Sequence, residues 1–154
     1  MNELGACPSV EEPGTRNVKE ARLERRSPRR GQSAAQVVNL TREQTLVTKG
    51  RLANSFWSRF RGLMGNDGLQ AGEGLLIVPC NSIHTHFMRF PIDVLYVGSD
   101  CEVVGIDHAL RPWRFGRIHR GARFVLELPA GTAKATNTQV GDRLEVTGCS
   151  LTRS

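Results

Sequence analysis

The chain has 154 residues, of which 39% are hydrophobic, and it carries a formal net charge of +6 at pH 7. This length suits one domain with its own core and is short for two. It contains no run of about 20 apolar residues that could cross a membrane as a helix, and no apolar segment typical of a secretory leader, so we expect a cytoplasmic protein without a transmembrane segment. The positive charge is compatible with an acidic protein, a nucleic acid or an anionic ligand, and it selects none of them.

The cysteines do not form the paired spacing of a structural zinc site. They are Cys7, Cys80, Cys101 and Cys149. Because no leader directs the chain to an oxidising compartment, we expect reduced thiols.

Residues 1–36 combine prolines and glycines with dispersed charges of both signs and few apolar groups. Such a segment cannot bury enough apolar surface to offset the entropy lost on ordering. We therefore predict a disordered basic tail over residues 1–36, a single globular domain over 37–148 and a C-terminal tail over 149–154.

Short apolar, β-branched runs separated by turn residues are typical of strands. They predict strands at residues 37–38, 46–48, 74–78, 93–97, 101–106, 124–128 and 143–146. The most regular unit is the hairpin formed by 93–97 and 101–106 around Gly98-Ser99-Asp100. We expect a mainly β (α+β) fold, a compact antiparallel β-barrel or sandwich-like domain with one or two short helices.

The helix is predicted to begin with Asn54 or Ser55 as its N-cap and to continue to Met64. A single helical turn is predicted within 132–138. In the first helix an i, i+4, i+7, i+8 pattern predicts one apolar, core-facing stripe. The stripe consists of Phe56, Phe60, Leu63 and Met64.

The stretch 83–97 holds the most unusual residues of the chain. Pro91 restricts the preceding residue to an extended backbone, so we expect a bend there. Before the bend, strand alternation predicts two opposite faces. One would carry Ile83, Thr85 and Phe87, and the other His84, His86 and Met88.

Residues 108–122 read as a long loop, and arginines recur there and just beyond it at every third position. They are Arg111, Arg114, Arg117, Arg120 and Arg123, with Trp113, Phe115 and His119 between them. Guanidinium groups bind carboxylate and phosphate, and aromatic rings stack on bases, so one interpretation is a site for an anionic ligand or single-stranded nucleic acid. The other is a solvated loop in which Trp113 packs on the core.

Six fragments in a fixed order resemble the bacterial and archaeal family named domain of unknown function 192. They are Arg61-Gly62-Leu63-Met64, Phe87-Met88-Arg89-Phe90-Pro91-Ile92-Asp93, Val103-Val104, Arg111-Pro112-Trp113-Arg114, Val125-Leu126-Glu127-Leu128-Pro129-Ala130-Gly131 and Val140-Gly141-Asp142. The resemblance covers roughly residues 45–146 and implies a compact, mainly β domain with a short helix and no established reaction. The family pattern usually has an aromatic residue at the position of His86.

Asp93 opens an apolar strand, so its carboxylate must be paired, hydrogen-bonded or protonated. A structural role is one interpretation, with bonds to backbone N–H groups at the bend or to an arginine. The other makes Asp93 a general base or ligand acceptor near His84. Cys80, His84 and His86 are weak candidates for metal ligands, and we expect no bound metal or cofactor.

The leading hypothesis is a non-catalytic binding domain that takes an anionic small molecule, peptide or protein partner. Its cleft would lie between the bend at Pro91 and the loop from Arg111 to Arg123. The ligand-binding candidates are His84, Asp93, Arg111, Trp113 and Arg114. The alternatives are a small hydrolytic or metal-assisted enzyme that uses Asp93 and His84, and nucleic-acid binding through the arginine loop.

Overall fold

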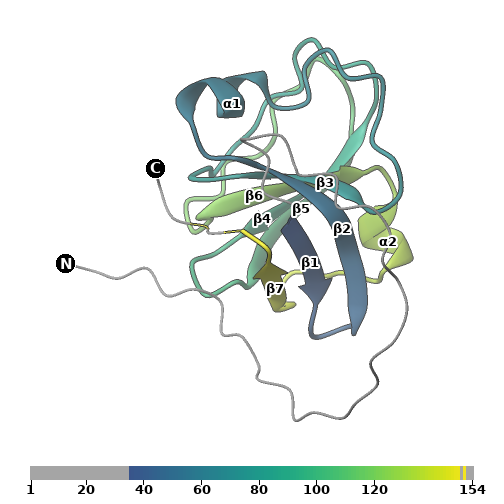
Figure 1. Cartoon of the computed structure of the whole chain (residues 1–154), viewed down its shortest axis with the longest axis vertical. Helices are drawn as coiled ribbons and strands as arrows, with labels where there is room; N and C mark the ends of the chain where they lie inside the picture. Colours follow the sequence, from purple (N-terminus) through teal and green to yellow (C-terminus); the bar gives the residue numbers. More distant parts are fainter. Residues whose placement is uncertain (1–34, 150, 152–154) are drawn as a thin grey trace, which may run out of the picture.

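The structure is a computed structural model that describes residues 35–149 and 151 (Figure 1). Of the tail predicted over residues 1–36, residues 1–34 lie outside this part of the chain. In order, the elements are β1 (Ala35–Asn39), β2 (Gln44–Ala53), α1 (Phe56–Arg61), β3 (Glu73–Ile77), β4 (Ile92–Val97), β5 (Val103–Leu110), β6 (Phe124–Pro129), α2 (Thr132–Ala135) and β7 (Leu144–Thr147). The predicted mainly β fold with two short helices is therefore confirmed, and β1 begins two residues before the predicted start of the domain.

The seven strands form one sheet in the order β5-β4-β6-β3-β2-β1-β7. Its two edge strands approach each other at one end, because Val103 donates its N–H to the Asp142 carbonyl (2.9 Å) and Leu144 donates to the Cys101 carbonyl (2.8 Å). The sheet thus curls into a half-barrel, as expected. Neighbouring strands are antiparallel, as expected, except β2 and β3, which run parallel.

Alternate residues of the central strands point to opposite faces of the sheet, and each face has its own apolar cluster. On β6, Phe124, Leu126 and Leu128 join the cluster that also receives α2 through Ala133. Val125 joins the second cluster, which includes Leu63 from the segment after α1. Glu127 shares the alternation of Val125, so it faces the second cluster.

Helix α1 is shorter than predicted, although Ser55 caps it as expected by accepting a hydrogen bond from the Ser58 N–H. It ends at Arg61 because Gly62 adopts φ +44°, a conformation that glycine tolerates best. The predicted apolar stripe is wrong for Phe60, which is 54% exposed, while Leu63 is buried from the segment after the helix.

Two further predictions are wrong in detail. β5 extends to Leu110, so the loop before β6 begins three residues later than predicted. In the segment before Pro91, Ile83 and Thr85 are buried as the alternation requires, but Phe87 has φ +62°. This left-handed residue reverses the pattern, so that Phe87 is exposed and Met88 is buried.

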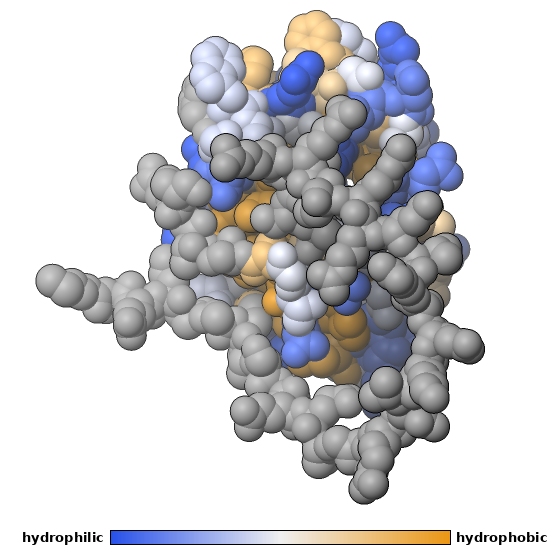
Figure 2. Space-filling view, viewed as in Figure 1, coloured by the Kyte–Doolittle hydropathy of each residue, from blue (hydrophilic) through white to orange (hydrophobic). Residues whose placement is uncertain are grey.

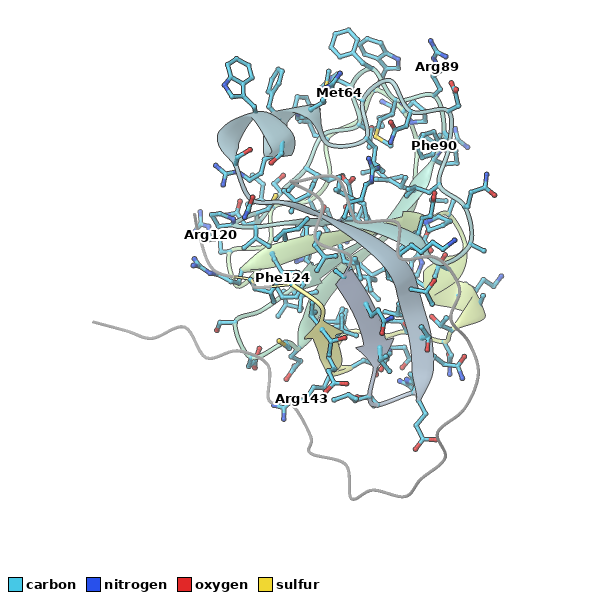
Figure 3. All side chains as sticks on the ribbon, in the orientation of Figure 1. Met64, Arg89, Phe90, Arg120, Phe124 and Arg143 are labelled. Carbon is cyan, nitrogen blue, oxygen red and sulfur yellow. The ribbon has the colours of Figure 1, made fainter. Side chains whose placement is uncertain are left out.

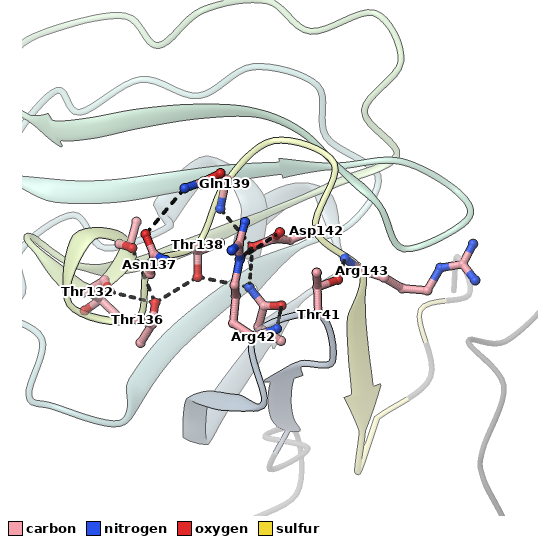
Figure 4. A network of polar contacts seen from close by, with 11 residues as sticks. Thr41, Arg42, Thr132, Thr136, Asn137, Thr138, Gln139, Asp142 and Arg143 are labelled. Carbon is pink, nitrogen blue, oxygen red and sulfur yellow. Dashed lines mark hydrogen bonds and ion pairs between the residues drawn. The ribbon is translucent and has the colours of Figure 1, made fainter.

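At the end of the molecule away from α1, a polar network links β1 to the chain before β7 (Figure 4). Asp142 is 2% exposed, and its carboxylate accepts hydrogen bonds from Asn39 Nδ2 (2.9 Å), Arg42 Nε (3.0 Å) and the Gln139 N–H (2.9 Å). Thr138 also accepts from Asn39. Every partner of this carboxylate is thus supplied by the protein, and the network fixes the end at which the sheet curls.

Cys80 and Cys149 are free thiols. Cys101 is disulfide-bonded, so the expectation of reduced thiols is wrong for that residue. Among the described residues, none of the helices is long and apolar enough to cross a membrane.

Candidate functional site

Six aromatic rings form a chain across the end of the molecule that carries α1. The ring of His86 is its centre, with centroids 5.3 Å from His84, 4.7 Å from Phe115 and 5.7 Å from Trp113. Phe60 of α1 extends the chain at one side, 6.2 Å from His84, and Phe87 extends it at the other, 4.7 Å from Trp113. Phe60, Phe87, Trp113 and Phe115 are each more than half exposed. These rings therefore form one continuous, partly apolar surface.

Buried Thr85 holds the two segments that carry these rings. Its hydroxyl lies 2.7 Å from the Arg111 carbonyl and accepts a hydrogen bond from the Arg114 N–H at 2.9 Å. Its backbone N–H donates to the Arg114 carbonyl, and its carbonyl accepts from the Trp113 N–H. One threonine thus sets the position of the loop relative to His84 and His86.

A second anchor lies under the far part of the loop. The Tyr96 hydroxyl donates to Asp107 Oδ2 (2.9 Å), which also accepts from the Arg117 N–H (3.0 Å). The His119 ring packs on the Tyr96 ring, with centroids 4.2 Å apart. This stacking requires glycine at position 105, where a Cβ atom would collide with the His119 ring.

The arginines of the loop do not form a single group. Arg117 pairs with Asp107, with Nε and Oδ1 3.5 Å apart, and Figure 3 places Arg120 beside the sheet, away from Arg89 and Met64 at the α1 end. Within the described residues, no carboxylate pairs with Arg61, Arg111 or Arg114, and all three are exposed. In Figure 2 the hydrophobic side chains at this end lie among strongly hydrophilic ones. We call the six rings and these three arginines the aromatic–arginine face.

A pocket of about 280 Å³ opens beside this face, between α1 and residues 79–88. We call it the α1 pocket. Its apolar lining includes Phe60, Leu63, Met64, Ile77, Ile83 and Met88, and its polar lining includes Arg59, Arg61, Cys80, Ser82, His84 and Glu127. Phe60, Arg61 and His84 belong to both the pocket and the face.

Two buried polar atoms at this pocket have no hydrogen-bond partner within residues 35–149 and 151, namely Glu127 Oε2 and His84 Nδ1. Burial raises the pKa of Glu127 to about 8, and Arg51 only partly opposes that effect. Burial also lowers the pKa of His84, and the nearby His86 lowers it further. At neutral pH the pocket therefore holds a protonated carboxyl group and an uncharged imidazole.

The site residues predicted from the sequence fall in different places. His84, Arg111, Trp113 and Arg114 meet at the aromatic–arginine face, but Asp93 does not. Asp93 is fully buried, and its two carboxylate oxygens accept hydrogen bonds from the Ala109 N–H (2.8 Å) and the Ala133 N–H (2.9 Å). Backbone N–H groups thus bind both oxygens of Asp93, as in the structural role considered for it, but they come from β5 and α2 and not from the bend at Pro91.

Cys80 and His84 line the α1 pocket, whereas His86 lies in the ring chain outside it. In the part of the chain that the structure describes, no three His, Cys, Asp or Glu side chains are arranged to hold a metal ion. Burial raises the pKa of the Cys80 thiol, which keeps it protonated and donating to the Ser82 carbonyl. These contacts give Cys80 a protein partner.

Residues 37–146 match the family DUF192, described as "Uncharacterized ACR". The chain belongs to the DUF192 family. The match covers the whole sheet except its first two residues and one residue of β7, so the α1 pocket and the aromatic–arginine face both lie on the family domain.

Relatives of this DUF192 chain include two archaeal proteins. The UPF0127 protein PF1050 of Pyrococcus furiosus is 35% identical over 71% of this chain and 96% of its own length. A UPF0127 protein of Thermococcus sibiricus is 33% identical over 71% of this chain and 73% of its own length.

Two solved structures share the fold of the DUF192 chain. A protein of unknown function from Novosphingobium aromaticivorans has a TM-score of 0.64 at 23% identity, covering 72% of this chain and 82% of its own. A candidate transcription regulator from Sinorhizobium meliloti has a TM-score of 0.64 at 26% identity, covering 75% of this chain and 93% of its own.

Sequence reasoning missed two residues of the site, Glu127 and Thr85. Glu127 is the only charged residue in the otherwise apolar strand β6, and that isolation was a usable signal. Thr85 carries no such signal, because its partners on the loop are 26 and 29 residues away.

Proposed function

We propose that this DUF192 domain is a non-catalytic binding module whose aromatic–arginine face takes an acidic, aromatic-containing segment of a partner protein. The observation that carries this proposal is the continuous chain of six rings beside three arginines that have no acidic partner among the described residues. Exposed apolar surface of this extent is uncommon unless it contacts another molecule.

The chemistry of the face favours an acidic partner. In the sequence Arg111 and Arg114 lie on either side of Trp113, and all three side chains are exposed. This part of the loop therefore offers two guanidinium groups and an indole to a bound segment. Arginine and tryptophan are enriched among the residues that dominate binding energy at interfaces. The rings are already packed edge-to-face on one another, so binding would order few additional side chains.

A random copolymer of glutamate and tyrosine is a suitable probe, because it supplies carboxylates and aromatic rings together. We expect it to bind the full chain, with affinity reduced about tenfold by Trp113→Ala and by Arg114→Ala. The matched control is Arg143→Ala, which removes the same charge at the opposite end of the molecule (Figure 3). If Arg114→Ala and Arg143→Ala lose the same affinity for the copolymer, then binding depends only on the net charge of the protein, which would contradict the proposal.

Single-stranded nucleic acid is the second candidate, favoured by the description of the Sinorhizobium meliloti structure as a candidate transcription regulator. Bases stack on exposed aromatic rings, and arginines neutralise phosphates. Binding of oligothymidylate that is tighter than binding of the copolymer, falls steeply with salt and requires Trp113 would support this candidate over the first.

A further inference from the structure

We propose that the α1 pocket binds a small monocarboxylic acid with an apolar tail, whose carboxylate contacts Glu127 and Arg59. The two carboxylate contacts are separate from the partner-binding proposal, because neither Glu127 nor Arg59 belongs to the aromatic–arginine face. Phe60, Arg61 and His84 border both the pocket and the face. The ligand would lie between the sheet and α1, with its tail among the apolar side chains of the pocket.

The sheet places Glu127 between apolar side chains that cannot form hydrogen bonds with its carboxyl group. Glu127 on β6 is flanked by Leu75 on β3 and by Val94 on β4, both of which are buried. The next residue in this row is Arg51, paired with Leu75 on β2. It lies two strands from Glu127, roughly 10 Å between backbones at the usual strand spacing. In the described part of the chain no ion pair joins the two side chains, and Glu127 Oε2 has no hydrogen-bond partner.

The unpartnered atoms point to a ligand. Glu127 is 2% exposed, and its Oε2 has no partner among the residues that the structure describes, although buried polar atoms in folded proteins are nearly always hydrogen-bonded. His84 Nδ1 is a second such atom on the same pocket. A polar group entering the pocket would supply the missing partner for either of these atoms.

The charges around the pocket select the ligand class. The ionisable groups around Glu127 come from four parts of the domain. They are Arg59 and Arg61 from α1, Cys80 and His84 from the 79–88 segment, Arg51 from β2 and Tyr96 from β4. At neutral pH the only charged groups in the lining are Arg59 and Arg61. A carboxylate accepts hydrogen bonds from a protonated Glu127 and from arginine, whereas an ammonium group would meet two like charges.

Arg59 is positioned for this role. Its Nη1 donates to the carbonyls of Asn54 (3.2 Å) and Val78 (3.3 Å), which holds the guanidinium at the pocket wall. A guanidinium has five N–H groups, so others remain for a ligand. The pocket volume of about 280 Å³ is at the lower end of the range for ligand sites, which suits a tail of about six to eight carbons.

Octanoate, octylamine and octanol make a matched series of probes for calorimetric titration of the full chain at pH 7. We expect octanoate to bind at least tenfold more tightly than the other two. Arg59→Leu should weaken octanoate at least tenfold, whereas Arg143→Leu, an equal loss of charge at the opposite end, should leave its affinity unchanged. Tighter binding of octylamine, equal binding of octanol and octanoate, or no binding of octanoate to the folded protein would each overturn the proposal.

The pH dependence identifies Glu127. Among the pocket groups described, Glu127 is the one expected to change its protonation state between pH 7 and 9. The pKa of His84 is lowered, and those of Cys80 and Tyr96 are raised. Octanoate affinity should fall about tenfold between pH 7 and 9 in the wild type. In Glu127→Gln, whose amide still donates a hydrogen bond, affinity should not change with pH, and an equal decline in both proteins would contradict the assignment. Trp113→Ala should leave octanoate binding intact, which separates this site from the face.

Discussion

The two ends of the half-barrel each contain a buried carboxyl group, and the protein treats them in opposite ways. Asp142 and Glu127 are both 2% exposed. Asp142 receives hydrogen bonds from Asn39, Arg42 and the Gln139 N–H, while Oε2 of Glu127 receives none from the described part of the chain. Two equally buried carboxyl groups therefore have different roles. Asp142 stabilises one end of the sheet, whereas we propose that Glu127 contacts a carboxylic acid ligand.

The pKa values of the two acids follow from this difference. Burial alone would raise the pKa of Asp142, but its hydrogen bonds from Arg42, Asn39 and Gln139 bring it below the ordinary value. For Glu127 burial acts almost unopposed and raises the pKa to about 8. The two ends of the molecule thus respond to pH with opposite signs.

The largest effect is expected from Asp142→Ala, which should lower the free energy of unfolding at pH 7 by about 3–5 kcal/mol, because Asn39 and Arg42 lose their partner. The folded-state pKa of Asp142 is lowered, so its contribution is present above the ordinary carboxyl pKa and is lost as pH falls through the folded value. Urea denaturation at pH 7 and pH 3 should show the difference shrinking at low pH. Asp100→Ala, an exposed acid in the β4–β5 turn, is the control, and an equal loss there would contradict the assigned role.

Glu127→Gln should act in the opposite direction and increase stability at high pH. The folded pKa of about 8 lies above the reference value of 4.5, so the stability of the wild type is full below pH 4.5 and declines as pH rises through 8. The variant lacks this decline and should be more stable than the wild type at pH 9 by on the order of 3 kcal/mol, with little difference at pH 4. Thermal melts from pH 4 to pH 9 measure the difference in stability between the two proteins. Parallel pH profiles for the two proteins would show that the pKa of Glu127 is not raised in the folded state.

Thr85→Val should cause an intermediate loss of stability and should also weaken binding at the aromatic–arginine face. The two side chains have similar shapes, but valine cannot bond the Arg111 carbonyl or the Arg114 N–H. The expected loss of stability is roughly 1–3 kcal/mol, together with weaker binding of the glutamate–tyrosine copolymer because the rings lose their common support. Thr45→Val, an exposed threonine on β2, provides the control. If Thr85→Val is less stable but binds the copolymer as the wild type does, then the position of the loop that Thr85 sets is not needed for binding.

The smallest effect on stability is expected for Phe115→Ala, a change at a ring that is 76% exposed. The free energy of unfolding should change by less than about 1 kcal/mol, since only edge-to-face contact with His86 is lost. Copolymer binding should nevertheless weaken. A stability loss as large as that of Asp142→Ala would show that the ring chain belongs to the core, and the contrast between the two ends would fail.

The sequence predicts what local patterns determine. The β4–β5 hairpin followed from alternation around Gly98-Ser99-Asp100, and Ser55 followed from cap chemistry. The parallel pairing of β2 with β3 could not be predicted, because it depends on how a distant segment returns to the sheet.

Of the candidate site, the sequence brought forward His84, Arg111, Trp113 and Arg114, whose residue types are unusual at any position. It assigned Asp93 to the same cleft, because a carboxylate beside a bend can serve a ligand or the backbone equally well. Only the structure, with the Ala109 and Ala133 N–H groups on its two oxygens, distinguishes these uses.

The parallel β2–β3 pair has a consequence for how DUF192 domains can diversify. Parallel neighbours cannot be joined by a tight turn, so the chain must leave the sheet after Ala53 and return at Glu73. That excursion carries α1, and with it one wall of the pocket. Changes in its length or composition would alter what the pocket accepts while leaving the register of all seven strands intact. Exchanging the segment between Ala53 and Glu73 between relatives should therefore transfer the ligand preference of the pocket without changing the sheet.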